Sequence, residues 1–260
     1  MKTAIIAAME REVASLVRNW KAREIVYDGL RYRAYENGDT ILVRGGIGML
    51  AARRAAEAVI HDAHPARLLS VGFAGALHSK MKVGDVIEPN VVVNAADGSR
   101  TGMRSGQGML VSYSAAADRE QKARLAQAYA ADAVDMEAAA VAQAAQAHGI
   151  AFAALKAISD SADFAMPPTE KFISSKGEFH SAAFALHVVL RPWLWRSTIT
   201  LLRNSAQASR ALCAAIESYL ARNSAADLNR LDDRHGTGTP ARTSGAWAER
   251  SQDSRAVEKR

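Results

Sequence analysis

The stretch LKAISDSADF, residues 155–164, places two carboxylates, Asp160 and Asp163, directly after a run of small apolar residues. A carboxylate that ends a buried strand must be hydrogen-bonded or have a raised pKa, and such a group can exchange a proton with a ligand. Asp160 is therefore a candidate functional residue, with capping of the next segment as the structural alternative. For Asp163, capping is as good an explanation as any.

Two further acids lie at predicted helix starts. Glu12 follows the apolar run TAIIAA, and Glu137 lies in VDMEAAAVA, where Asp135 could be the N-terminal cap. The helix dipole favours a carboxylate at such positions whatever the function, so neither acid is decisive alone. Carboxylates in different environments can nevertheless divide acid and base work between them.

A glycine cluster, RGGIG at residues 44–48, opens the next predicted helix. Its backbone amides could hold an anion or a ribose oxygen, which would bring Gly46, Ile47 and Gly48 into a binding site. A plain tight turn explains the motif equally well. The spacing G-G-x-G differs from the dinucleotide fingerprint, so it does not indicate a dinucleotide cofactor.

Motifs of other chemistries are missing from the sequence. His78 and His148 lack ligand spacing with any partner, so we expect no metal site. There is also no G-x-S-x-G elbow and no P-loop lysine.

The elements that must position these residues alternate between strands and helices. We expect strands at 3–8, 67–77, 86–93, 108–112 and 152–158, a hairpin around Asn37-Gly38, and helices at 49–63, 119–129 and 138–148. This alternation predicts an α/β domain with a largely parallel or mixed sheet. The polar clusters fall at the ends of the predicted strands, where such sheets bind ligands, so we expect one shared site.

Length and composition limit the class of protein. The 260 residues can bury a substantial core, and the composition is 49% hydrophobic but only 6% aromatic. The net charge of +6 is modest and spread along the chain, so nucleic-acid binding is not demanded. Cys213 is the single cysteine, and no signal peptide or run of about 20 apolar residues is visible, so we expect a cytoplasmic protein.

The C-terminal third differs in pattern from the rest. We predict a catalytic domain at 1–185, an amphipathic helical region at 186–222, and a disordered tail at 223–260. Within 191–210, Trp195, Ile199 and Leu202 share one helical face beside a row of arginines, which is typical of a helix at a membrane surface. Packing on the same domain or on a partner subunit is the alternative, and it is the favoured one.

Five ordered motifs resemble the nucleoside phosphorylase superfamily. They are AIIAAMEREV, RGGIGMLAA, SVGFAGAL with KVGDVI, AVDMEAAAVA and KAISDSAD. Within that superfamily the sequence is most similar to methylthioadenosine/S-adenosylhomocysteine nucleosidases and to hopanoid-associated nucleoside phosphorylases. The resemblance covers roughly residues 1–185. It implies a three-layer α/β/α domain with a mixed central sheet, nucleoside phosphorylase-like, that cleaves the N-glycosidic bond of a purine-type nucleoside, usually as a homo-oligomer.

The resemblance also implies residue roles. Asp160 matches the acid that protonates the purine, with Ser159 as its orienting partner, and Glu12 matches the acid that activates the attacking water. Met136 and Glu137 match the residues that hold the ribose. This chemistry needs such groups, because cleavage leaves positive charge on the ribose and negative charge on the departing base.

Lys156 stands where the nucleosidases carry an arginine, and it could present its charge to a water or to a phosphate co-substrate. The sequence leaves open which of the two is the nucleophile.

Three departures from the family pattern suggest a more open site. Phe73 replaces a serine or threonine, the segment between Pro89 and Gly108 is short, and the aromatic that stacks on adenine after LVS is missing. Tyr113 could substitute for it, beside Ser112 at the strand end. A bulkier substrate is then expected, and an adenosylated lipid of the hopanoid pathway would fit if the C-terminal helix meets the inner membrane. The competing hypothesis is a non-catalytic nucleoside-binding or sensing protein.

Overall fold

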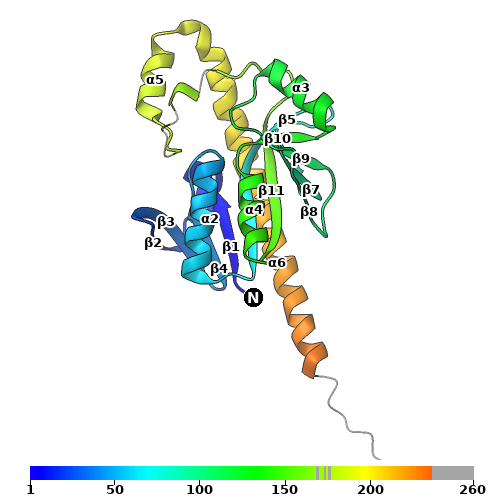
Figure 1. Cartoon of the computed structure of the whole chain (residues 1–260). Coiled ribbons are helices and arrows are strands. Elements are labelled where there is room, and N and C mark those ends of the chain that lie inside the picture. Colours follow the sequence, from blue (N-terminus) through cyan, green and yellow to red (C-terminus); the bar gives the residue numbers. More distant parts are fainter. Residues whose placement is uncertain (168–169, 173, 175–176, 236–260) are drawn as a thin grey trace, which may run out of the picture.

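The computed structural model describes residues 1–167, 170–172, 174 and 177–235. In this part of the chain, eleven strands form one mixed sheet with helices on both faces (Figure 1). The strands are β1 Thr3–Ala7, β2 Lys21–Tyr27, β3 Leu30–Asn37, β4 Thr40–Arg44, β5 Arg67–Ala76, β6 Val86–Ile87, β7 Val91–Asn94, β8 Arg100–Gly102, β9 Met109–Ser112, β10 Ala133–Asp135 and β11 Ala151–Asp160. The helices are α1 Glu10–Val17, α2 Met49–Ala63, α3 Arg119–Tyr129, α4 Ala138–Ala147, α5 Ser181–Val189 and α6 Trp195–His235, with short 3₁₀ turns η1 Glu170–Phe172 and η2 Pro192–Leu194.

The centre of the sheet is parallel. Strand β5 pairs in parallel with β1 and with β11, and β1 pairs in parallel with β4. The last residues of β5 also pair with β10, antiparallel, which joins the β9-β7-β8 part of the sheet to the rest. The carboxyl ends of β1, β5 and β11 therefore lie at one edge, as the sequence predicts for a shared site.

Two helical layers cover the sheet, and alternate residues of β1 show why. Ala4 and Ile6 pack in a cluster with α2 and α4, whereas Ile5 and Ala7 pack in a second cluster with α1 and α6. Since successive side chains of a strand point to opposite faces, a strand buried on both faces is apolar throughout. The predicted three-layer α/β/α fold with a mixed sheet is confirmed.

Several predicted elements differ in detail. The hairpin at Asn37-Gly38 is confirmed as β3 and β4, and Gly38 has the positive φ of 55° that its turn requires. Strand β2 at the sheet edge was not expected; three of its seven residues are charged and four are exposed. The strand predicted at 86–93 is interrupted, because Pro89 separates β6 from β7.

Helix α6 corrects both predicted C-terminal boundaries. Its buried residues Leu212 and Ile216 pack against α1 and the sheet, so part of the region predicted as separate at 186–222 belongs to the core of the catalytic domain. The helix also continues through 223–235, where the tail was predicted to begin. That segment contains no proline or glycine that would end a helix. Residues 236–260 of the predicted tail lie outside the described residues.

The region of α5, η2 and the first turns of α6 stands apart from the sheet (Figure 1). It carries large apolar side chains that are between 49% and 73% exposed, which we call the exposed apolar set: Leu186, Val189, Leu190, Trp193, Trp195, Ile199 and Leu202. The predicted face with Trp195 and Ile199 is therefore uncovered, and packing on the chain's own domain does not account for it. No described helix is long and apolar enough to cross a membrane.

Candidate active site

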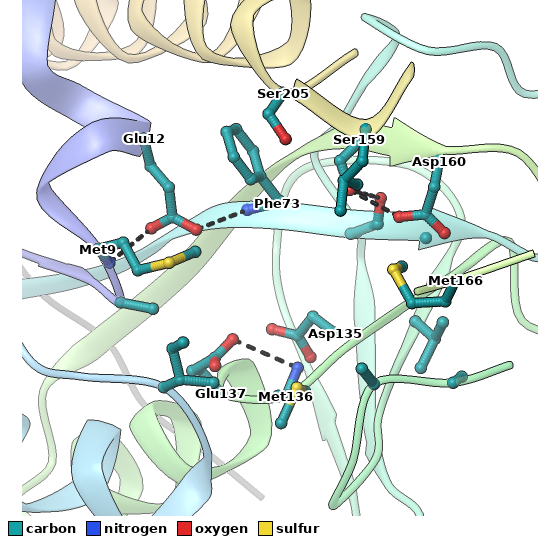
Figure 2. Close-up of a pocket in the computed structure, with 18 of the residues that line it drawn as sticks. Met9, Glu12, Phe73, Asp135, Met136, Glu137, Ser159, Asp160, Met166 and Ser205 are labelled. Atoms are coloured by element: carbon teal, nitrogen blue, oxygen red, sulfur yellow. Dashed lines mark hydrogen bonds between the residues drawn. The ribbon is translucent and has the colours of Figure 1, made fainter. Parts of the chain in front are cut away.

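A cleft lies at the carboxyl ends of β1, β5 and β11. Figure 2 shows Glu12, Glu137 and Asp160 pointing into it from different sides, with Phe73 and Met136 between them. Strand β5, the loops before α1 and α4, helix α3 and helix α6 contribute the remaining wall. The prediction that polar strand ends converge on one site is confirmed for these residues.

Glu12 lies in the first turn of α1 and is 2% exposed. One carboxylate oxygen, Oε2, accepts a hydrogen bond from the Met9 amide at 2.9 Å, and Oε1 accepts one from the Phe73 amide at 3.4 Å (Figure 2). Burial raises the pKa of Glu12, and the Met9 amide and the Lys156 ammonium oppose that rise only in part. A carboxyl group with a raised pKa holds a proton more readily than an ordinary glutamate, which suits a base that must take a proton from water.

Glu137 ties the glycine cluster to the cleft. Its Oε1 accepts a hydrogen bond from the Gly48 amide at 2.8 Å, and its Oε2 accepts one from the Met136 amide at 3.3 Å. Burial raises the pKa of Glu137 to about 7, with the Lys156 ammonium lowering it and the Asp135 carboxylate raising it. An ionised Glu137 is an acceptor for hydroxyl donors such as those of a ribose.

The glycine cluster does not form an anion cradle. Its amides already have acceptors: Gly45 donates to the Ala7 carbonyl, Gly46 to the Ala8 carbonyl, Ile47 to the Gly177 carbonyl, and Gly48 to Glu137. Of the three residues predicted to bind substrate through this loop, Ile47 lines the cleft, whereas Gly46 and Gly48 do not. The loop acts as a turn that connects β4, β1 and Glu137.

Lys156 is not placed as predicted. Its side chain is 0% exposed and does not line the cleft, and its Nζ lies 2.9 Å from Asp135 Oδ2 as an ion pair. Burial disfavours the charge, but Asp135, Glu137 and Glu12 outweigh it, so the pKa of Lys156 is raised. Lys156 is therefore a buried counter-charge beneath the carboxylates rather than a group that faces a nucleophile. The reason is that Lys156 lies within β11 and its side chain enters the sheet's packing.

Asp135 and Ser112 form the floor under Glu137. Ser112 Oγ donates to Asp135 Oδ1 at 2.6 Å and accepts from the Ala139 amide at 2.9 Å, while Asp135 Oδ2 accepts from the Ala138 amide at 2.8 Å. The N-cap position of α4 is Glu137, so Asp135 is not the cap residue itself, but it does accept from the first amide of the helix as the predicted cap would. Ser112, predicted to bind substrate, is fully buried and supports the start of α4 instead.

Tyr113, which was predicted to contact the substrate, lies elsewhere in the structure. It does not line the cleft and packs beside Val111 and Leu125 in a cluster under α3. The wall where a stacking aromatic was expected is built by the small residues Ala115, Ala116 and Ala117. The ring of Phe73 does line the cleft, as predicted.

Asp160 ends β11 and is 2% exposed. Its Oδ1 accepts a hydrogen bond from Ser159 Oγ at 2.7 Å, so the expected pairing of these two residues is confirmed in geometry (Figure 2). Its Oδ2 accepts from Nζ of Lys122, a partner that the sequence did not reveal. Asp163, by contrast, is exposed and accepts from Ser161 Oγ at 2.7 Å, which lowers its pKa.

Lys122 was missed because a lysine in REQKARLAQAY suggests a solvent-exposed helix face. A signal was nevertheless present, since Lys122 precedes Leu125 and Tyr129 by three and seven positions and so shares their face. The cleft residues Leu201 and Ser205 were missed as well, because α6 is distant in sequence and was assigned to a separate region.

The site contains more acidic than basic side chains. The buried charged side chains among the described residues are Glu12, Asp135, Glu137, Asp160, Lys122 and Lys156. Four carboxyl groups thus share two ammonium groups, which favours a cationic ligand or transition state. In the same part of the chain, no group of three His, Cys, Asp or Glu side chains is arranged to hold a metal ion.

Comparison with known proteins places this geometry in a family. The profile of the Phosphorylase superfamily matches residues 2–128 and 99–190. A 5′-methylthioadenosine/S-adenosylhomocysteine nucleosidase of Bacillus velezensis is 26% identical over 230 residues, which cover 74% of this chain and 99% of that protein. The same type of enzyme from Hydrogenovibrio crunogenus is 35% identical over 113 residues, a match that covers 41% of this chain and only 48% of that relative.

A solved structure shows the same fold. The S-adenosylhomocysteine nucleosidase of Streptococcus pyogenes, in complex with 5-methylthiotubericidin, superposes with a TM-score of 0.63 at 21% identity. The superposition covers 85% of this chain and 96% of that one.

Proposed function

The chain belongs to the phosphorylase superfamily, and on that premise we propose that it cleaves the N-glycosidic bond of an adenosine-derived nucleoside with water as the nucleophile. The observation that carries the proposal is the convergence of Glu12, Glu137 and Asp160 on one cleft. Each of the three is buried and held by hydrogen bonds. The relatives named above support the adenosine-derived substrate class.

Asp160 is assigned the role of protonating the departing base. When the C1′–N9 bond breaks, its electron pair goes to the base, and a proton delivered to the base neutralises the charge that develops. Asp160 is oriented toward this step by Ser159, which fixes one of its oxygens. Such general acid catalysis typically contributes about 10²–10⁴ in rate.

The ribose is assigned to Glu137 and Met136. Glu137 is fixed by the Gly48 amide, and its carboxylate can accept from the sugar hydroxyls while the ring gains positive charge. Asp135 also lines the cleft beside Glu137, and Lys156 lies behind it as a fully buried ion-pair partner.

The nucleophile is assigned to a water held by Glu12. Its raised pKa suits a base that takes the proton of that water as the oxygen bonds to C1′. Two observations favour water over phosphate. The glycine-cluster amides are already engaged by the protein, and Lys156 is buried and paired, so neither offers donors to a phosphate anion.

A lipid-linked nucleoside is the substrate class that the C-terminal region favours. Leu201 and Ser205 of α6 line the cleft, and the same helix carries the exposed residues Ile199 and Leu202 within one turn of Leu201. An apolar group attached to the 5′ side of the nucleoside could therefore leave the cleft along α6. An adenosylated lipid of the hopanoid type has this chemistry.

The activity is tested by base release. Purified protein is given methylthioadenosine, adenosylhomocysteine or an adenosyl lipid in vesicles, and adenine is measured by chromatography. We expect release from at least one of the three, fastest from the lipid. Release from none of them would contradict the proposal and leave the non-catalytic nucleoside-binding function, which equilibrium binding of adenosine to the same preparations would support.

We also propose that the exposed apolar set contacts an anionic lipid surface, which is the peripheral membrane contact expected for residues 191–210. Arg191, Arg196 and Arg203 lie among these apolar side chains, and cations beside apolar groups match an anionic interface. The proposal rests on this charge complementarity. A second copy of the chain is the competing occupant of the surface.

The membrane contact is tested by point substitution, because deletion of 191–222 would also remove the core residues Leu212 and Ile216. The variant W195S/I199S/L202S should lose co-sedimentation with vesicles that contain anionic lipid. A control outside the proposed contact is R222A, which changes an exposed residue farther along α6. Unchanged sedimentation of the triple variant would contradict the lipid contact, and light scattering that shows a wild-type dimer dissociated by the substitutions would assign the surface to a second copy instead.

A further inference from the structure

Lys122 is a cationic side chain in the wall of the cleft that the proposed mechanism leaves unused. It projects from α3, its side chain is 2% exposed, and it lines the cleft beside Asp160. Its Nζ donates to Asp160 Oδ2 and, at 2.7 Å, to the Ser161 carbonyl. A buried ammonium normally needs such partners, but one that also faces a ligand site can act on the ligand's chemistry.

The hydrogen bonds around Asp160 engage both of its carboxyl oxygens. Oδ1 accepts from Ser159 Oγ and Oδ2 accepts from the Lys122 ammonium. A general acid must carry a proton when the base leaves, and because both oxygens of Asp160 accept, a neighbouring donor has to supply it. The Lys122 ammonium, which donates to Asp160, is such a donor.

We propose that Lys122 supplies the proton that Asp160 delivers to the departing base. This assignment rests on the proposed function. Substrate entry displaces water from the cleft, and loss of solvation favours the neutral pair over the ion pair. The Lys122 Nζ–H bond breaks and an Asp160 O–H bond forms. That O–H bond then breaks as the base takes the proton and the C1′–N9 bond cleaves.

The proton count closes over one turnover. The attacking water bonds to C1′ and gives its proton to Glu12, and Lys122 has given one proton to the base. Glu12 then releases a proton to solvent and Lys122 takes one up. Close packing keeps the pair in register, because a Cβ at Gly75 would lie 2.9 Å from Asp160 Oδ2 and 3.0 Å from Lys122 Cε.

The substitution Lys122→Arg tests whether Lys122 acts through its positive charge or by supplying a proton. Arginine keeps the positive charge and the donors, but its pKa above 12 prevents transfer of a proton at neutral pH. Lys122→Met keeps the chain length and removes both. Arg124→Met is the matched control on α3, since Arg124 is 78% exposed and pairs only with Glu120 across one helical turn among the described residues.

The readout compares two leaving groups. The base of methylthioadenosine needs protonation, whereas the phenolate of 4-nitrophenyl β-riboside leaves without it. We expect Lys122→Arg and Lys122→Met to lower kcat for methylthioadenosine about 10²-fold or more, with KM little changed, and to lower kcat for the nitrophenyl riboside by far less. The control should leave the ratio of the two rates unchanged, and circular dichroism shows that each variant is folded.

Equal losses on the two substrates would overturn the assignment, because they would show a structural role. Full activity of Lys122→Arg on methylthioadenosine would also overturn it. A wild-type protein that cleaves neither the nucleosides nor the nitrophenyl riboside would instead contradict the proposed function itself, and this assignment with it.

Discussion

Asp160 and Asp163 lie three residues apart on the same segment but have opposite environments. Asp160 is buried between Ser159 and Lys122, and Asp163 is exposed with Ser161 as its partner. Their spacing suggested a pair, and the structure separates them into one cleft residue and one surface residue. The two therefore form a natural test and control.

We expect Asp160→Asn to lower base release by about 10²–10⁴, because the amide keeps the shape but cannot deliver an acidic proton. Asp163→Asn should leave kcat within about twofold of the wild type. Both are measured as kcat for methylthioadenosine, with circular dichroism to confirm folding. Near-normal turnover of Asp160→Asn would remove Asp160 from the mechanism.

The raised pKa of Glu137 makes the stability of the fold depend on pH. Burial raises its pKa to about 7 from an ordinary value near 4.5, so the folded protein binds this proton more tightly than the unfolded chain does. Between those two pH values the folded state holds more protons, and stability therefore falls as the pH rises. The loss is on the order of 3 kcal/mol, given about 1.4 kcal/mol per pKa unit.

Glu137→Gln should remove this dependence. Urea unfolding at pH 5 and pH 8 is expected to show that the wild type loses free energy of unfolding relative to the variant as the pH rises. A difference between the two proteins that is the same at both pH values would contradict the raised pKa.

At the scale of elements, the glycine turn before α2 is a positioning device. Gly48 has a φ of +94° and its amide donates to Glu137. Gly38 also has a positive φ, +55°, but it lies in the β3–β4 hairpin. A Cβ at either glycine would meet no atom within 4 Å, so substitution strains the backbone at both without steric overlap.

Gly48→Ala should therefore raise KM for the nucleoside about tenfold through a displaced Glu137, while Gly38→Ala should leave KM unchanged. Both variants should lose a similar stability, about 1 kcal/mol, for the strained φ. Thermal unfolding and steady-state kinetics measure the two effects. Equal KM values in the two variants would show that the Gly48 contact does not position Glu137.

The sequence predicted the elements better than it predicted the directions of side chains. The apolar runs of β1 and β5 and the glycine turns have local signatures, so their strands and turns could be inferred. Ser112 and Tyr113 were expected in the site because they lie at a strand end, and Lys156 because it stands where the family carries an arginine, but all three side chains pack away from the cleft. A shift of one residue along a strand reverses the face, and no local pattern fixes that register.

Helix α6 contacts the hydrophobic core, helix α1 and the cleft. Its residues Leu212 and Ile216 complete the core, Ser209 Oγ donates to the Glu12 carbonyl at 3.0 Å, and Leu201 and Ser205 reach the cleft. These contacts connect residues about 200 positions apart in sequence, and their partners could not be inferred from either segment alone. One helix thus supports the site, borders it, and carries the surface proposed to meet a lipid.

The identity of the nucleophile, water or phosphate, tests the proposed mechanism most directly. The decisive measurement is the sugar product of the reaction with methylthioadenosine, or with the adenosyl lipid if that is the better substrate, in 50 mM phosphate, identified by ³¹P and ¹H nuclear magnetic resonance. The occupied glycine-loop amides and the buried Lys156 predict a free sugar and free adenine, with no sugar phosphate and no change in rate when phosphate is omitted. A sugar 1-phosphate, formed only when phosphate is present, would contradict the account.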